Sequence, residues 1–205
     1  MTESSPTQSQ HPAYEWHEVW LWVMSQPSVH TFQAVLQDKN ASVKRAFSWV
    51  FIAGAIGSLV FLLLTMPLTA EFIAIAGFVI ALTGFMMLFI FVIGLRILQA
   101  IAMRLGGKGT YNDLYIVAGS YAAPLALSNF ILIPFALNNP DVLTIYVFAY
   151  SIVQWTFTGI ALKAVNPNLD WNRILLAIAV VIGIGLVASG IFSVFSASVL
   201  SGLAT

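Results

Sequence analysis

Residues 72–95 read FIAIAGFVIALTGFMMLFIFVIGL, a run in which no residue is charged. A transmembrane helix needs about 20 consecutive apolar residues to cross roughly 30 Å of hydrocarbon. Only helices and closed barrels satisfy every backbone hydrogen bond in lipid, and this run lacks the alternation of a barrel strand. Residues 72–95 therefore predict a membrane-spanning helix.

Four more uncharged apolar runs of similar length flank this one, at residues 46–66, 114–137, 142–162 and 174–200. The chain of 205 residues is 60% hydrophobic and only 8% charged, whereas soluble domains carry about 25% charged residues. The sequence therefore predicts an all-α polytopic bundle of five transmembrane helices over residues 43–205.

The segment before the first span is different in character. Residues 1–13 are polar and rich in Ser, Thr, Gln and Pro, which predicts a disordered tail. Residues 14–42 hold two short amphipathic helical patterns, the first containing Trp16 and Trp20 and the second containing Phe32. Tryptophan-rich helices of this kind lie among lipid headgroups or pack on the bundle, and both arrangements stay open.

The placement of charge predicts how the chain threads the membrane. With the N-terminus inside, the inner segments hold every cation of the chain: Lys39, Lys44, Arg45, Arg96, Arg104, Lys108, Lys163 and Arg173. The two outer turns carry only Glu71 and Asp141. By the positive-inside rule, the N-terminus is cytoplasmic and the C-terminus lies outside after five spans. The short N-terminal region favours a bacterial plasma membrane.

The second inner segment ends in a glycine-rich loop. We expect the second span to continue as a helix past Arg96 and Arg104 and to stop at Gly106 and Gly107. Lys108 follows, and Asn112 or Asp113 is expected to cap the next helix, just beyond Tyr111. The loop does not fit a nucleotide-binding P-loop, because a helix precedes it and no Ser or Thr directly follows the lysine. Contacts between its cations and lipid phosphates are expected.

The predicted spans contain no acidic, basic or histidine residue, and the chain has no cysteine. Proton relays, haem ligation and intramembrane metal hydrolysis all require such groups at depth. The sequence therefore predicts a non-enzymatic protein. It predicts no metal site and no cofactor site. The balanced net charge gives no reason to expect nucleic acid as a partner.

Neutral polar side chains gather in the third and fourth spans. By helical rise, Tyr121 lies at the depth of Gln154, and Asn129 at that of Tyr150. Hydrogen bonds between the two helices are the simpler interpretation. A polar groove that serves a solute or a partner is the alternative.

The fifth span carries small residues at a spacing of four, among them Gly185, Ser189 and Ser193. The first span has small residues near Gly54 and Gly57, and the second has Gly77 and Gly84. Small residues at this spacing let helix backbones approach closely in lipid. They serve contacts within the bundle or, on the fifth span, a homo-oligomer or partner face.

Two stretches resemble the YIP family of multi-pass membrane proteins, named for interaction with Ypt/Rab GTPases, and its bacterial branch in particular. One is the aromatic entry from Trp20 to Phe32 with Pro27-Ser28 inside it. The other is the loop Leu105–Tyr111 with the later Tyr121-Ala-Ala-Pro124. The Asp-Leu-Tyr-Gly-Pro motif of eukaryotic members has no counterpart here, because Ile116 follows Asp113-Leu-Tyr115.

This resemblance implies an adaptor or scaffold that acts in membrane organisation or trafficking through membrane or cytosolic protein partners, without catalysis. The segment with Trp16, Trp20 and Phe32 and the Gly106–Tyr111 loop would carry the recognition. A small-solute transporter or channel, and an accessory subunit of a larger membrane complex, are the alternatives.

Overall fold

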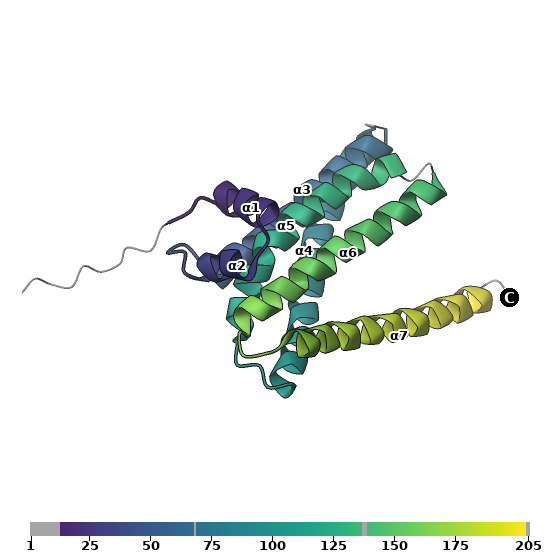
Figure 1. The fold of residues 1–205 in the computed structure, drawn as a ribbon. Coiled ribbons are helices and arrows are strands. Elements are labelled where there is room, and N and C mark those ends of the chain that lie inside the picture. Colours follow the sequence, from purple (N-terminus) through teal and green to yellow (C-terminus); the bar gives the residue numbers. More distant parts are fainter. Residues whose placement is uncertain (1–12, 68, 137–138, 204–205) are drawn as a thin grey trace, which may run out of the picture.

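The computed structural model describes residues 13–67, 69–136 and 139–203, with the side chains of residues 71, 72, 74, 135, 136 and 188–203 outside the description. These described residues form helices and no strand (Figure 1). The predicted tail at 1–13 lies outside them, except for Ala13. The helices are α1 (Trp16–Ser25), α2 (Val29–Leu36), α3 (Val43–Thr65), α4 (Ala70–Arg104), α5 (Tyr111–Ala136), α6 (Pro140–Val165) and α7 (Trp171–Leu203).

The helical membrane bundle expected from the sequence is confirmed. Four helices, α3 to α6, are long and apolar enough to cross a bilayer, and the described side chains of α7 add an apolar stretch over Trp171–Val187. The helices run on past the predicted spans, because a helix need not end where the hydrocarbon does. Thus α4 continues nine residues beyond Leu95, to Arg104.

One end of the bundle collects the loops and cations, and we call it the basic end. It comprises α1, α2, the connection from Leu105 to Thr110 between α4 and α5, and the connection from Asn166 to Asp170 between α6 and α7. In Figure 1 α1 and α2 lie at the left and the two connections below them, whereas the turn between α3 and α4 lies at the opposite end, at the upper right. An integral multi-pass protein of this kind thus has two chemically different ends.

Glycines and alanines allow α3 to lie against both α4 and α5. A Cβ on Gly54 of α3 would lie 3.3 Å from the Cα of Gly84 on α4. On the α5 side, a Cβ on Gly119 would lie 2.7 Å from the Cβ of Ala46 and 3.0 Å from its Cα. The small residues of the first two spans that meet these neighbours therefore make contacts within the bundle.

We expect Gly119→Ala to destabilise the protein by about 1–3 kcal/mol, because the added methyl meets the backbone of α3, which cannot rotate away. Gly77→Ala on α4 is the matched control, since no described atom outside the backbone of α4 lies within 4 Å of the Cβ it would add. The thermal unfolding midpoint in detergent measures both. Equal midpoints for the two variants would contradict the close approach of α3 and α5.

Helix α7 leaves the bundle as it proceeds. Figure 1 shows it beside α4 and α6 at its start and diverging from α6 toward its C-terminal end. Among the described residues, and apart from the backbone of α7 itself, no atom lies within 4 Å of a Cβ added at Gly183 or Gly185, and Ile184, Leu186 and Val187 are exposed. Within one chain, Gly183 and Gly185 therefore pack against no other described helix. The side chains of Ser189 and Ser193 lie outside the description.

Candidate functional site

The first two helices pack on the bundle rather than standing apart from it. Val19 and Val23 of α1 and Phe32 of α2 are fully buried in the main core cluster. The ring of Phe32 lies 5.9 Å from that of Tyr121 on α5. Trp16, by contrast, leaves half of its surface exposed. The side of this segment that carries Val19, Val23 and Phe32 therefore packs on the bundle, while Trp16 lies at its exposed edge.

Local sequence explains why this segment folds as two helices. Pro27 follows the end of α1, and the Ser28 side chain accepts a hydrogen bond from the Thr31 backbone N–H at 3.0 Å, which caps α2. The Thr31 hydroxyl in turn donates to the Gln26 carbonyl at 2.8 Å. The turn between α1 and α2 is thus fixed by its own side chains.

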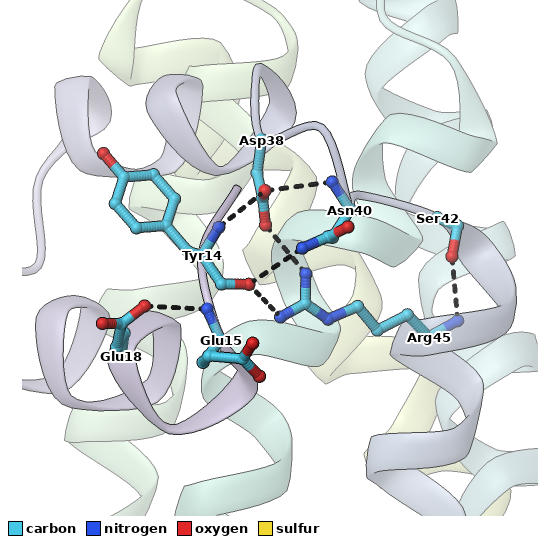
Figure 2. Close-up of polar contacts among 7 residues, drawn as sticks. All are labelled: Tyr14, Glu15, Glu18, Asp38, Asn40, Ser42 and Arg45. Atoms are coloured by element: carbon cyan, nitrogen blue, oxygen red, sulfur yellow. Dashed lines mark hydrogen bonds and ion pairs between the residues drawn. The ribbon is translucent and has the colours of Figure 1, made fainter. Parts of the chain in front are cut away.

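A buried acid holds the start of α1 to the start of α3 (Figure 2). The Asp38 carboxylate, almost fully buried, accepts from Arg45 Nη1 at 2.8 Å, from the Tyr14 N–H at 3.1 Å and from the Asn40 N–H at 3.0 Å. Arg45 Nη2 also donates to the Tyr14 carbonyl at 2.9 Å, and its guanidinium lies 4.7 Å from the centre of the Trp49 ring. The Asp38–Arg45 ion pair thus joins the start of α1, the connection between α2 and α3, and the start of α3. We call this ion pair, with its bonds to Tyr14 and Asn40, the α1 latch.

A second polar cluster joins the two loops of the basic end. Gln99 of α4 and Asn166 after α6 are both fully buried. Asn166 Nδ2 donates to Gln99 Oε1 at 3.1 Å, and Asn166 Oδ1 accepts from the Gly109 N–H at 2.8 Å. Gln99 Nε2 donates to the Gly109 carbonyl at 2.6 Å. We call these three residues the loop clamp.

Further bonds extend the loop clamp. Asn168 Nδ2 donates to the Gly106 carbonyl at 2.5 Å, and Arg173 Nη1 donates to the Leu105 carbonyl at 3.0 Å. Lys163 donates to the carbonyls of Pro167 and Leu169. The connection between α6 and α7 is therefore bonded along its length to its surroundings.

The glycine loop itself has a structural explanation. Gly106 has a positive φ of 100°, which ends α4 as expected. The Gly107 N–H donates to the Ala102 carbonyl at 2.8 Å, and the Gly109 N–H is taken by Asn166. A phosphate-binding loop instead directs its N–H groups at the ligand. This loop directs them into the protein.

The cap of α5 differs from the expectation. The cap is Thr110, not Asn112 or Asp113. The Thr110 hydroxyl accepts from the Asp113 N–H at 3.1 Å and donates to the Asp113 carboxylate at 2.7 Å. The threonine hydroxyl is one turn ahead of the free N–H groups, as an N-cap must be. Asp113 then lies in the first turn, where the helix dipole favours an acid.

Some cations and aromatic residues near the loop clamp are exposed, whereas Lys163 and Arg173 bond to loop carbonyls. Four exposed residues form what we call the docking patch: Arg104, Lys108, Tyr111 and Trp171. None of them has an ion-pair partner among the residues that the structure describes. Arg96, also exposed, lies farther along α4 and donates from Nε to the Tyr115 hydroxyl at 3.1 Å.

Neutral polar side chains inside the bundle mostly satisfy one another. The hydroxyls of Tyr121 and Thr158 lie 2.8 Å apart, and Tyr146 donates to Asn129 Oδ1 at 2.9 Å. The sequence places Gln154 opposite Tyr121 and Tyr150 opposite Asn129. The observed partners, Thr158 and Tyr146, each lie one helical turn away from those residues. Tyr150 instead has its ring centre 6.1 Å from that of Tyr146.

Gln154 lines a cavity of about 240 Å³ between α4, α5, α6 and α7, together with Tyr121 and Thr158. Because the hydroxyls of Tyr121 and Thr158 are already bonded to each other, the side-chain polar groups left in this lining are those of Gln154 and Trp155. Of the four residues that the sequence suggests for a solute path, Asn129 and Tyr150 do not line this cavity.

Several residues of these clusters were not singled out from the sequence. Asp38, Gln99, Asn166 and Tyr146 are the main ones. Gln99 did carry a signal, as a polar residue among apolar ones near the end of α4, and Asn166 precedes a proline at the end of α6. Among the described residues, no three His, Cys, Asp or Glu side chains lie close enough together to hold a metal ion.

Comparison with known proteins gives one match. A family model described as the Yip1 domain matches residues 22–192. No curated protein and no solved structure matches the chain. The matched region begins inside α1 and includes the Asp38–Arg45 ion pair of the α1 latch, although not Tyr14, together with the loop clamp and the docking patch. Since the match covers most of the chain, the protein belongs to the Yip1-domain family of integral membrane proteins.

Proposed function

We propose that this protein is a non-enzymatic membrane adaptor that holds a protein partner at its basic end. The basic end is cytoplasmic in this proposal, because the cations of the chain lie in its loops or in the parts of the helices that adjoin them. The α1 latch and the loop clamp support the idea, since they make this end a fixed surface, and a preformed surface loses little conformational entropy on binding.

The docking patch is the observation that carries the proposal. Arginine, tyrosine and tryptophan are the residues most enriched where binding energy concentrates in protein interfaces. Here Arg104, Tyr111 and Trp171 stand exposed around a loop whose backbone is bonded internally. Lys108 adds a second cation, so the patch complements a partner surface with carboxylates. The buried polar pairs between α5 and α6 bond to each other and offer a partner nothing comparable.

A photo-crosslinking amino acid at Tyr111 tests this in native membranes. We expect one discrete protein adduct, and none from the same amino acid at Phe148, a more exposed position on the apolar surface of α6. The double variant Arg104→Glu with Lys108→Glu should reduce the adduct about tenfold, because it reverses the charge presented to the partner. Folding should be unaffected, since both side chains are exposed.

Two results would end the proposal. One is a Tyr111 position that yields only lipid adducts, as expected if the patch merely lies among headgroups. The other is a protein adduct that persists unchanged after charge reversal. The unfolding midpoint of the double variant serves as the control for its integrity.

A further inference from the structure

A groove runs from the α1 latch into the first membrane span. It lies between α1, α3 and α5 and has a volume of about 780 Å³, within the range of roughly 300–1,000 Å³ typical of small-molecule sites. Its walls are apolar and aromatic, formed by Trp16, Trp20, Trp49, Ile52, Ile56 and Leu127. Its mouth is polar, with Glu15, Lys44 and Arg45 around it.

The order of polar and apolar groups along the groove matches that of a membrane lipid. Lys44 lies in the first turn of α3, and Ile56 lies twelve residues farther along the same helix. At 1.5 Å per residue the two are about 18 Å apart, close to the half-thickness of a bilayer core of roughly 30 Å. A groove of this length covers one leaflet.

Charge distinguishes the kind of headgroup that fits. Arg45 is already paired with Asp38, whereas Lys44 is exposed and forms no ion pair among the residues that the structure describes. Glu15 is likewise exposed at the mouth, so the unpaired cation and acid together have no net charge. A headgroup with a phosphate and an ammonium complements this pair better than a purely anionic one.

Trp20 supplies an independent observation. Its indole nitrogen is the one buried side-chain nitrogen or oxygen without a hydrogen-bond partner in the described part of the chain. Buried polar groups normally have a partner, and an orphaned one is unfavourable. Trp20 lines the groove, so a lipid bound there would place an ester carbonyl, a hydrogen-bond acceptor, beside the ring that carries this unpartnered donor.

We infer that this groove binds one zwitterionic glycerophospholipid, with the phosphate at Lys44, the ammonium toward Glu15 and an acyl chain along Ile52 and Ile56. The lipid comes from the leaflet that surrounds the basic end. It fills the space between α1 and α3 that the protein's own side chains leave open.

Native mass spectrometry of the delipidated protein, titrated with phosphatidylethanolamine, tests the inference. One lipid per chain should bind, and diacylglycerol with the same acyl chains should bind about tenfold more weakly, because it lacks the phosphate. Phosphatidylglycerol should also bind more weakly. Lys44→Glu and Ile56→Trp should each weaken phosphatidylethanolamine binding, the first at the mouth and the second by filling the groove. Ile145→Trp, on the exposed surface of α6, is the control.

Three outcomes would overturn the site. Equal binding by all three lipids, or by wild type and both groove variants, would show only non-specific adhesion. A protein dimer abolished by Ile56→Trp would make a second copy the occupant. Lipid binding that appears only after deletion of residues 1–12 would make that segment the occupant. Lys44→Glu keeps the test valid even if Ile56→Trp fails to fold, since Lys44 is exposed.

Discussion

Replacing Asn166 by leucine is expected to destabilise the folded protein by about 3–5 kcal/mol. The amide of Asn166 bonds to Gln99, to the Gly109 N–H and to the Leu162 carbonyl, all within a buried cluster. Leucine has a similar size and none of these groups. The Gln99 side-chain oxygen and the Gly109 N–H would then be left without a partner, at about 1–3 kcal/mol each, while the Gln99 Nε2 would keep its bond to the Gly109 carbonyl.

The unfolding midpoint in detergent is the measurement, and a drop of about 10 °C corresponds to this loss in a chain of this size. Asn172→Leu is the matched control, since Asn172 is exposed at the start of α7. The double variant Gln99→Leu with Asn166→Leu should lose less than the sum of the two single changes, because each single change orphans the other amide. Additive losses would mean that the two amides do not interact.

Removing the acid of the α1 latch should free α1 while leaving the bundle folded. Asp38→Ala leaves Arg45 without its carboxylate and leaves the Tyr14 and Asn40 N–H groups without an acceptor. Breaking a buried ion pair from one side costs about 3–5 kcal/mol. Much of this should appear as local opening of α1, because Asp38 bonds to the start of that helix.

Asp170→Ala makes the comparison within the same protein. Both acids contact an arginine, but the Asp38 side chain is 2% exposed and the Asp170 side chain is 61% exposed. Exposed pairs contribute about 0–1 kcal/mol. Hydrogen–deuterium exchange should therefore accelerate markedly over all of Trp16–Ser25 in Asp38→Ala, and in the other variant only in the first turn of α7, where Asp170 accepts from the Arg173 N–H. Equal acceleration at the two sites would contradict the assigned role of burial.

The predictable part of this fold is the part that depends on neighbours in sequence. Long uncharged runs identify α3 to α6, Gly106 ends α4, and Ser28 caps α2, because each signal lies within a few residues of its effect. The loop clamp could not be predicted in this way. Gln99 and Asn166 are 67 residues apart, and neither has a local pattern that identifies the other.

The polar pairs between α5 and α6 show how far a count of helical rise can be trusted. The count places Tyr121 opposite Gln154, but its hydroxyl meets Thr158, one turn closer to the basic end. Helical side chains lean toward the N-terminus of their own helix, and the N-terminus of α5 is at the basic end. Depth is therefore predictable to about one turn, which is too coarse to choose between Gln154 and Thr158.

The loop clamp has a mechanical consequence for the helices that it joins. With α4, α5 and α6 bonded together near Asn166, adjustment to a thinner or thicker bilayer changes the angles between helices about that point. A helix of 26 residues such as α6 is about 39 Å long, so a tilt of about 10° moves its far tip by about 7 Å. The helix tips around Pro67 and Pro140 thus travel with the membrane, while the surface around Lys108 keeps its shape.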